Sequence, residues 1–229
     1  MDDCAPVSIR DRALSVIDRV RRAEERAGRP HGSVRIVAVS KTRGASEVLE
    51  AFSAGIWEFG ENYVQEAEAK AGVLPAGILL HMVGGLQSNK ARRAARIFSM
   101  VQGLDSESAA AALDRACLDL GRRMDVLVQV NVASEATKGG VRPDGLADFL
   151  GKLEGLGYIK PRGVMVIPPA GLSARYFPEA RRIFERARQN AADPASFDIL
   201  SMGMSADFEE AISEGAGIVR IGRAIFGER

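Results

Sequence analysis

The chain has 229 residues and a formal net charge of +1, with 46% hydrophobic and 27% charged residues. This is the composition of an ordinary soluble protein that is large enough to bury a sizeable core. The balanced charge gives no electrostatic argument for a nucleic-acid or membrane partner. No apolar run approaches the roughly 18 residues expected of a membrane-spanning helix, and the first residues lack the pattern of a signal peptide. With only Cys4 and Cys117, no disulfide framework is expected, which favours a cytoplasmic protein.

The chain alternates helical and strand-like patterns from beginning to end. A helix is expected over residues 8–28, where apolar residues recur at helical spacing until Gly28. Eight short apolar runs typical of strands follow, and helical patterns separate them. The runs cover residues 34–40, 55–60, 77–84, 97–105, 125–132, 161–168, 197–203 and 216–222.

Alternation of this kind implies parallel strands joined by helical crossovers. Eight such units favour a closed (β/α)8 barrel, a TIM barrel, over an open doubly wound sheet. An open sheet would also need a glycine-rich dinucleotide turn after its first strand, which residues 40–46 do not supply. We therefore expect one barrel domain over residues 1–229, in which residues 1–33 form a lead and a helix that covers the outside or bottom of the barrel.

In such a barrel the chemistry lies at the carboxyl ends of the strands. Lys41 follows the first strand, and "SMGMSAD" and "RIGRAIFG" follow the seventh and eighth. Ser205 is expected to cap a helix, so that its hydroxyl and the N–H groups of Ala206 and Asp207 point at an anion. Gly222 would let a second group of amides approach the same anion. These features predict a phosphate site, although a simple helix cap and a simple turn explain the same residues.

Lys41 would face this phosphate site across the mouth of the barrel. An amine so placed can form a Schiff base with an aldehyde, and an aldehyde cofactor that carries a phosphate is pyridoxal 5′-phosphate. The alternative is a strand-end lysine whose charge merely reaches solvent. Because Lys41 is expected to lie opposite a phosphate site, the Schiff-base hypothesis is favoured over a lysine that only reaches solvent.

Five segments of the chain resemble the signature segments of one known family. They are "AVSK", "FGENYVQE", "GGLQSNK", "SMGMSADFEEAI" and "VRIGRAIFG". Together they resemble the pyridoxal phosphate homeostasis protein family, also called the YggS/PROSC-like family, from about Val34 to Gly227. The resemblance implies a single (β/α)8 barrel similar to the N-terminal domain of alanine racemase, with pyridoxal 5′-phosphate as cofactor.

The resemblance also implies roles for individual residues. Lys41 matches the Schiff-base lysine, Asn62 lies near the cofactor, Ser205 matches the phosphate-binding serine, and Arg220 matches the arginine at the pyridine end. Lys138 matches a second lysine near the site, which could accept the cofactor by transimination or could be a solvated loop lysine.

Four further residues complete the candidate cofactor-binding set. Met165, Met204 and Gly222 follow or end strands at the expected mouth. Arg223 stands where many relatives carry threonine or serine, so a hydroxyl ligand to the phosphate is lost. Its guanidinium could add a bidentate contact if it turns inward.

The expected function is that of a cofactor carrier with little or no catalytic activity. An arginine at the pyridine nitrogen disfavours protonation of the ring and weakens carbanion stabilisation. A racemase of the similar barrel type also needs a tyrosine from a C-terminal β-domain, which we do not expect here. Tyr63 and Tyr158 are expected to pack in the core or at the rim, and His81 to make structural hydrogen bonds. Two histidines, His31 and His81, predict no metal cluster.

Two enzyme hypotheses compete with the carrier. The first is a small racemase or transaminase that uses the same lysine, and the second is a barrel enzyme for a phosphorylated sugar or indole substrate without the cofactor. For the carrier we expect a monomer that takes part in vitamin B6 homeostasis and releases pyridoxal 5′-phosphate to apo-enzymes.

Overall fold

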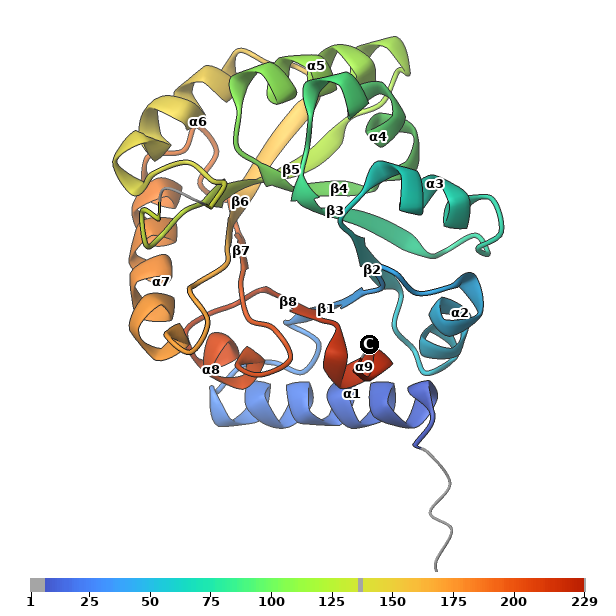
Figure 1. Cartoon of the computed structure of the whole chain (residues 1–229). Helices are drawn as coiled ribbons and strands as arrows, with labels where there is room; N and C mark the ends of the chain where they lie inside the picture. Colours follow the sequence, from blue (N-terminus) through green and yellow to red (C-terminus); the bar gives the residue numbers. More distant parts are fainter. Residues whose placement is uncertain (1–6, 136–137, 229) are drawn as a thin grey trace, which may run out of the picture.

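Eight parallel strands close into a barrel in the order β1 to β8, surrounded by helices (Figure 1). The structure is a computed structural model that describes residues 7–135 and 138–228, so Cys4 lies outside the described residues. The predicted TIM barrel is confirmed, and every predicted strand is present. In the described residues no helix is long and apolar enough to cross a membrane.

The strands are short and the helices of the outer ring vary in length. The strands are β1 (Arg35–Val39), β2 (Glu58–Glu61), β3 (Leu79–Gly85), β4 (Met100–Leu104), β5 (Met124–Val130), β6 (Ile159–Val166), β7 (Ile199–Ser201) and β8 (Ile218–Ile221). The helices are α1 (Ile9–Arg26), α2 (Ala45–Ser53), α3 (Val64–Ala71), α4 (Ala91–Ile97), α5 (Glu107–Asp119), α6 (Leu146–Glu154), α7 (Ser173–Gln189), α8 (Phe208–Ser213) and α9 (Arg223–Phe226).

Helix α1 lies on the outside of the barrel, as predicted, and packs against α2, α8 and α9 (Figure 1). Ser8 caps its start by accepting a hydrogen bond from the Asp11 N–H at 3.0 Å. The helix ends before Gly28, which has a φ of +66°, a conformation that glycine adopts without steric cost. Because α9 has only one turn, α1 supplies most of the helical cover outside β8 and β1.

The lumen of the barrel is filled by side chains from alternate positions of the strands. An apolar layer contains Val37, Val83, Met100, Leu127, Met165, Ile199 and Ile218, with Val39 packed against it. Successive side chains of a strand point to opposite faces, so the residues between these positions face the helices. The lumen is therefore a packed core, and any ligand must bind at one of its ends.

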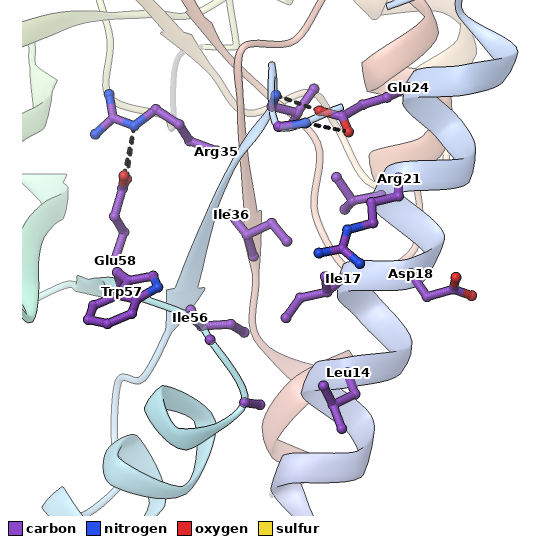
Figure 2. Close-up of a pocket in the computed structure, with 15 residues that line it drawn as sticks. Leu14, Ile17, Asp18, Arg21, Glu24, Arg35, Ile36, Ile56, Trp57 and Glu58 are labelled. Atoms are coloured by element: carbon purple, nitrogen blue, oxygen red, sulfur yellow. Dashed lines mark hydrogen bonds and ion pairs between the residues drawn. The ribbon is translucent and has the colours of Figure 1, made fainter. Parts of the chain in front are cut away.

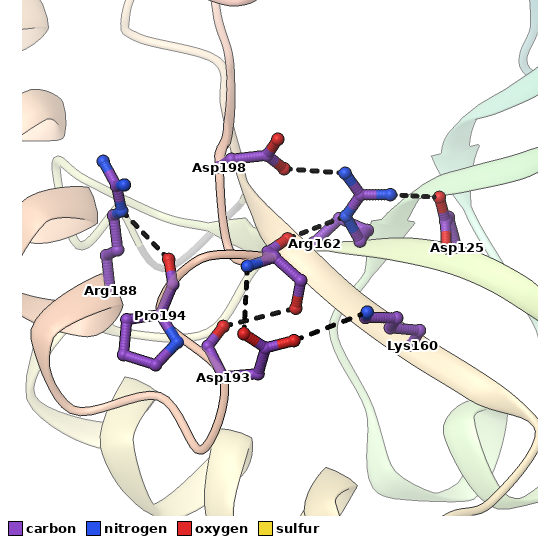
Figure 3. A network of polar contacts seen from close by, with 8 residues as sticks. Asp125, Lys160, Arg162, Arg188, Asp193, Pro194 and Asp198 are labelled. Atoms are coloured by element: carbon purple, nitrogen blue, oxygen red, sulfur yellow. Dashed lines mark hydrogen bonds and ion pairs between the residues drawn. The ribbon is translucent and has the colours of Figure 1, made fainter.

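The amino ends of β5, β6 and β7 are tied together by Arg162 (Figure 3). Its guanidinium bonds Asp125 at 2.8 Å, Asp198 at 2.9 Å and the Ser196 carbonyl at 2.7 Å. Arg162 is the extra residue of a bulge, because Val126 pairs with Pro161 and the next pair is Leu127 with Gly163. These charges stabilise the end of the barrel opposite to Lys41.

Candidate functional site

Lys41 lies at the mouth of the barrel, just beyond the end of β1. Val37 and Val39 point into the lumen, and the alternation of the strand places Lys41 next in the same inward series. The side chain is half-buried and lines a pocket. Its amine makes no ion pair with any residue among 7–135 and 138–228, so nothing described there holds it away from a ligand.

The turn that presents Lys41 has an unusual backbone. Arg43 N–H donates to the Ser40 carbonyl at 3.0 Å, and Thr42 has a φ of +65°. A β-branched residue in this region is a true outlier that the surroundings must hold in place. The Glu66 carboxylate of α3 does so by accepting the Thr42 N–H at 3.1 Å.

A buried ion pair supports the same turn from behind. Lys70 Nζ donates to Glu61 Oε1 at 2.6 Å and to the Ser40 carbonyl at 2.7 Å, and Ser40 Oγ donates to Glu61 Oε1 at 2.6 Å. Glu61 is fully buried, and its Oε2 has no hydrogen-bond partner among the described residues. Burial raises the pKa of Glu61, and the bonds from Lys70 and Ser40 offset part of this rise.

Six of the nine predicted residues meet in one pocket at the mouth of the barrel. The pocket has a volume of about 450 Å³, within the usual range for small-ligand sites. It lies between the turn after β1 and the segments that follow β7 and β8. The six residues are Lys41, Met204, Ser205, Arg220, Gly222 and Arg223.

Ser205 does not cap helix α8, so that prediction is wrong. The helix begins at Phe208 with Asp207 as its N-cap, and the Asp207 N–H is used in a bond to the Met204 carbonyl at 3.1 Å. Ser205 Oγ instead accepts the Ala224 N–H of α9 at 3.2 Å. Ser205 thereby joins the loop after β7 to the start of α9, and its hydroxyl keeps a hydrogen that it can still donate, since Oγ is the acceptor in this bond.

Arg220 forms the buried floor of the pocket. Its side chain is 5% exposed and donates to Ser201 Oγ at 2.6 Å and to the Val166 carbonyl at 2.9 Å. Burial lowers the pKa of Arg220 to about 10, while the charge of Asp207 acts in the opposite direction. The guanidinium therefore stays charged at neutral pH.

Three predicted residues lie outside this pocket. Asn62 lines a neighbouring pocket of about 290 Å³ at the ends of β2 and β3. Met165 is fully buried in the apolar layer of the lumen. Lys138 lies on the loop after β5 and pairs with Glu135 at 3.2 Å, with its side chain 38% exposed.

The rim of the pocket is formed by the segment after β8. The Arg223 side chain is 68% exposed, and its Nη1 lies 3.8 Å from Glu228 Oε1. In this structure the guanidinium therefore does not turn inward. Arg43, which the sequence did not single out, donates to the Gly227 and Glu228 carbonyls at 3.0 Å each. These two bonds attach the end of the described chain to the turn that carries Lys41.

His81 lies inside the lumen, away from the pocket. Its Nδ1 is 2.9 Å from Gln102 Nε2, and its Nε2 lies 3.6 Å from Glu58 Oε2. Burial lowers the pKa of His81 to about 3, and the nearby charge of Arg35 acts in the same direction. The imidazole is thus neutral in the folded protein, in line with the structural role expected for it.

The neutral His81 makes stability fall at acidic pH. Its pKa is lower in the folded state than in the unfolded chain, so between about pH 6.5 and pH 3 the unfolded state binds more protons. We expect the wild-type protein to lose about 2 kcal/mol more unfolding free energy between pH 7 and pH 5 than His81→Gln does. Urea denaturation at both pH values measures this. His31→Gln, at an exposed histidine, should behave as wild type; equal losses in wild type and His81→Gln would contradict the expectation.

A second pocket of about 420 Å³ lies at the other end of β1, between α1 and the start of β2 (Figure 2). Leu14 and Ile17 of α1 face Ile36 and Ile56 there. Apolar side chains dominate its walls and none of the predicted site residues lines it. The mouth pocket is therefore the candidate functional site.

Comparison with known proteins places the fold in a defined class. The family profile described as "Alanine racemase, N-terminal domain" matches residues 15–229. Alanine racemase from Corynebacterium glutamicum shares the fold, with a TM-score of 0.66 at 18% identity over 93% of this chain and 60% of that one. The class is therefore the alanine racemase N-terminal barrel.

Closer relatives define the family. The "Pyridoxal phosphate homeostasis protein" of Pseudomonas aeruginosa is 39% identical, over 97% of this chain and 96% of that protein. PipY of Synechococcus elongatus has been solved with pyridoxal phosphate bound; it is 38% identical, with a TM-score of 0.79 over 93% of this chain and all of that one. The chain belongs to the pyridoxal phosphate homeostasis protein family, as its sequence segments indicated.

Proposed function

We propose that this protein binds pyridoxal 5′-phosphate in the mouth pocket, as a Schiff base on Lys41, and takes part in the homeostasis of that cofactor. The observation that carries the proposal is the pocket itself, which brings an amine, a serine hydroxyl and a buried guanidinium together. The pyridoxal phosphate bound to the homologue PipY supports the same ligand.

The residues of the pocket fit the three chemical parts of this cofactor. The Lys41 amine would bind the aldehyde by forming a C=N bond to its carbon with loss of water. The Ser205 hydroxyl and the backbone at Gly222 and Arg223 would hold the phosphate. Arg220, at the floor of the pocket, would face the ring. Met204 lies at its edge, 38% exposed.

The remaining predicted residues would act from outside this pocket. Asn62 would approach the cofactor only from the neighbouring pocket, and Met165 would support the floor from within the lumen. Lys138 would have to leave Glu135 to act as an acceptor. We assign direct contacts to the six residues of the mouth pocket and indirect roles to these three.

A carrier with little or no catalytic activity is favoured over a racemase. Racemisation needs an acid or base on each face of the substrate carbon. Tyr63 lines the neighbouring pocket and is 60% exposed, and Tyr158 precedes β6 at the opposite end of the barrel. Neither tyrosine lines the mouth pocket with Lys41, where a second proton donor would be needed. The partly open pocket suits release of the cofactor to apo-enzymes in the cytoplasm by a monomer.

Lys41→Ala tests the covalent link. We expect purified protein incubated with pyridoxal 5′-phosphate to gain a visible absorption band, and borohydride to reduce the C=N bond so that the cofactor stays attached to Lys41 in mass spectra. Lys41→Ala should lose both signals, whereas Lys138→Ala should retain them. A wild-type protein that stays colourless would refute the proposal and favour a barrel enzyme for a phosphorylated substrate. Turnover of D- and L-alanine by the coloured protein would favour the racemase.

A further inference from the structure

A row of buried polar side chains crosses the apolar lumen of the barrel. Arg220 of β8, Ser201 of β7, Gln102 of β4 and His81 of β3 are each at most 5% exposed. The barrel would close with apolar residues at these positions as well, and buried polar groups rarely add stability over well-packed apolar ones. The row therefore calls for an explanation other than stability of the fold.

The hydrogen bonds of this row have one fixed direction. Arg220 can only donate, so Ser201 Oγ must accept from it at 2.6 Å. The single hydroxyl hydrogen of Ser201 then goes to Gln102 Oε1 at 2.7 Å. This acceptance fixes the orientation of the amide, whose Nε2 faces across the lumen.

The same logic fixes the far end of the row. Gln102 Nε2 donates to His81 Nδ1 at 2.9 Å, so the hydrogen of the neutral imidazole is on Nε2. That atom is buried, has no hydrogen-bond partner within the described residues, and faces the Glu58 carboxylate at 3.6 Å. Glu58 is in turn bound by Arg35 at 2.8 Å.

The row cannot carry protons, because a primary amide neither accepts nor releases one readily. Its effect is orientation. The Ser201 lone pair is held toward Arg220 only while the Ser201 hydrogen is held by Gln102, and Gln102 keeps that orientation only while His81 accepts from it. Loss of any member would free the next side chain to rotate or leave a buried group unpaired.

We propose that Ser201, Gln102 and His81 are positioning residues, which hold the Arg220 guanidinium at the floor of the pocket in the orientation that faces the ring of the bound cofactor. The inference rests on the proposed function, because it assigns a purpose to the floor of the same pocket. It adds that this orientation is set from β3 and β4, on the far side of the lumen.

The test compares variants that differ only in the hydroxyl. Ser201→Thr keeps the hydroxyl and Ser201→Val loses it at nearly equal volume. We expect Ser201→Val to bind pyridoxal 5′-phosphate about tenfold more weakly than Ser201→Thr, the effect of one buried hydrogen bond. The pH midpoint of the absorption change of the bound cofactor should also shift in Ser201→Val. Ser201→Ala repeats the comparison without added volume, in case the larger side chains prevent folding.

A double-mutant cycle distinguishes a row from independent packing effects. Gln102→Leu should weaken binding and shift the pH midpoint in the wild-type background, and should add nothing further in Ser201→Ala. Met100→Ala, at another lumen position of β4, should lower the unfolding free energy without moving the midpoint. The inference would be overturned if the effects of Gln102→Leu and Ser201→Ala on binding were additive, or if neither variant shifted the pH midpoint. A wild-type protein that forms no coloured complex would refute the proposed function. A wild-type protein that forms the complex, with variants that bind the cofactor equally well, would refute the inference alone.

Discussion

Lys70→Met is expected to lower the free energy of unfolding by about 3–5 kcal/mol, the effect of leaving one charge of a buried ion pair without its partner. Lys70 is 8% exposed, and Glu61 is fully buried with Oε2 already unpartnered among the described residues. The variant would keep only the Ser40 hydroxyl on the Glu61 carboxylate. Urea denaturation at pH 7 measures the loss.

The pH dependence of this loss identifies its cause. Without Lys70 the pKa of Glu61 rises further, and a carboxyl with a raised folded pKa loses stability as pH increases above its unfolded value. The Lys70→Met penalty should therefore be larger at pH 8 than at pH 5. Lys152→Met is the matched control, since Lys152 Nζ and Glu107 Oε1 are 2.7 Å apart but both side chains are more than half exposed. It should cost far less than Lys70→Met at either pH, because water screens an exposed ion pair. If the loss of unfolding free energy in Lys70→Met were the same at both pH values, the unpaired charge of Glu61 would not be its cause.

Gly163→Ala is expected to lower the unfolding free energy by about 3–5 kcal/mol, because steric overlap and backbone strain act together. Gly163 follows the bulge of β6 with a φ of +151°. A Cβ atom there would lie 1.8 Å from the Ile199 carbonyl oxygen. Ile199 pairs with Gly163 in the ladder between β6 and β7, so one of the two strands would have to move.

Gly121→Ala separates the two causes of this effect. Gly121 also has a positive φ, of +62°, but a Cβ there would meet no atom within 4 Å. The Gly121→Ala variant should lose only about 1 kcal/mol of unfolding free energy, from the backbone conformation alone. Thermal or urea unfolding of both variants measures the difference. Similar losses would show that crowding against Ile199 has little effect.

The barrel was predictable because each strand carries its own local signal. Runs such as residues 125–132 are bounded by turns and separated by helical patterns, and parallel pairing with crossovers follows from that order. Strand bounds differed by one to three residues at each end, most at the starts of β2 and β4, and β7 is short because only Ile199–Ser201 pairs with its neighbours. Where the chain leaves the ladder depends on tertiary contacts that no local pattern records.

The site was predictable to the level of its pocket but not of its internal bonds. The strand-end position of Lys41 and the resemblance of "SMGMS" and "VRIG" predicted a set of residues of which six line one pocket in the structure. That these residues bind the cofactor stays a prediction. The partner of Ser205 was missed because Ala224 lies on another element. Lys70 gave a signal that went unused: it occupies the buried face of α3 with Val64 and Ala67, where a charged residue needs a buried partner.

The two bonds from Arg43 to the segment after β8 join residues up to 185 positions apart in the chain. The pocket has one wall from the turn after β1 and the other from the segments that follow β7 and β8, so neither half of the chain contains it. Synthesis on a ribosome proceeds from the amino end, so the turn that carries Lys41 is made long before the segments that follow β7 and β8. The pocket can therefore form only after nearly the whole remaining chain has been made. Retention of the cofactor would therefore report that a newly made molecule has finished folding.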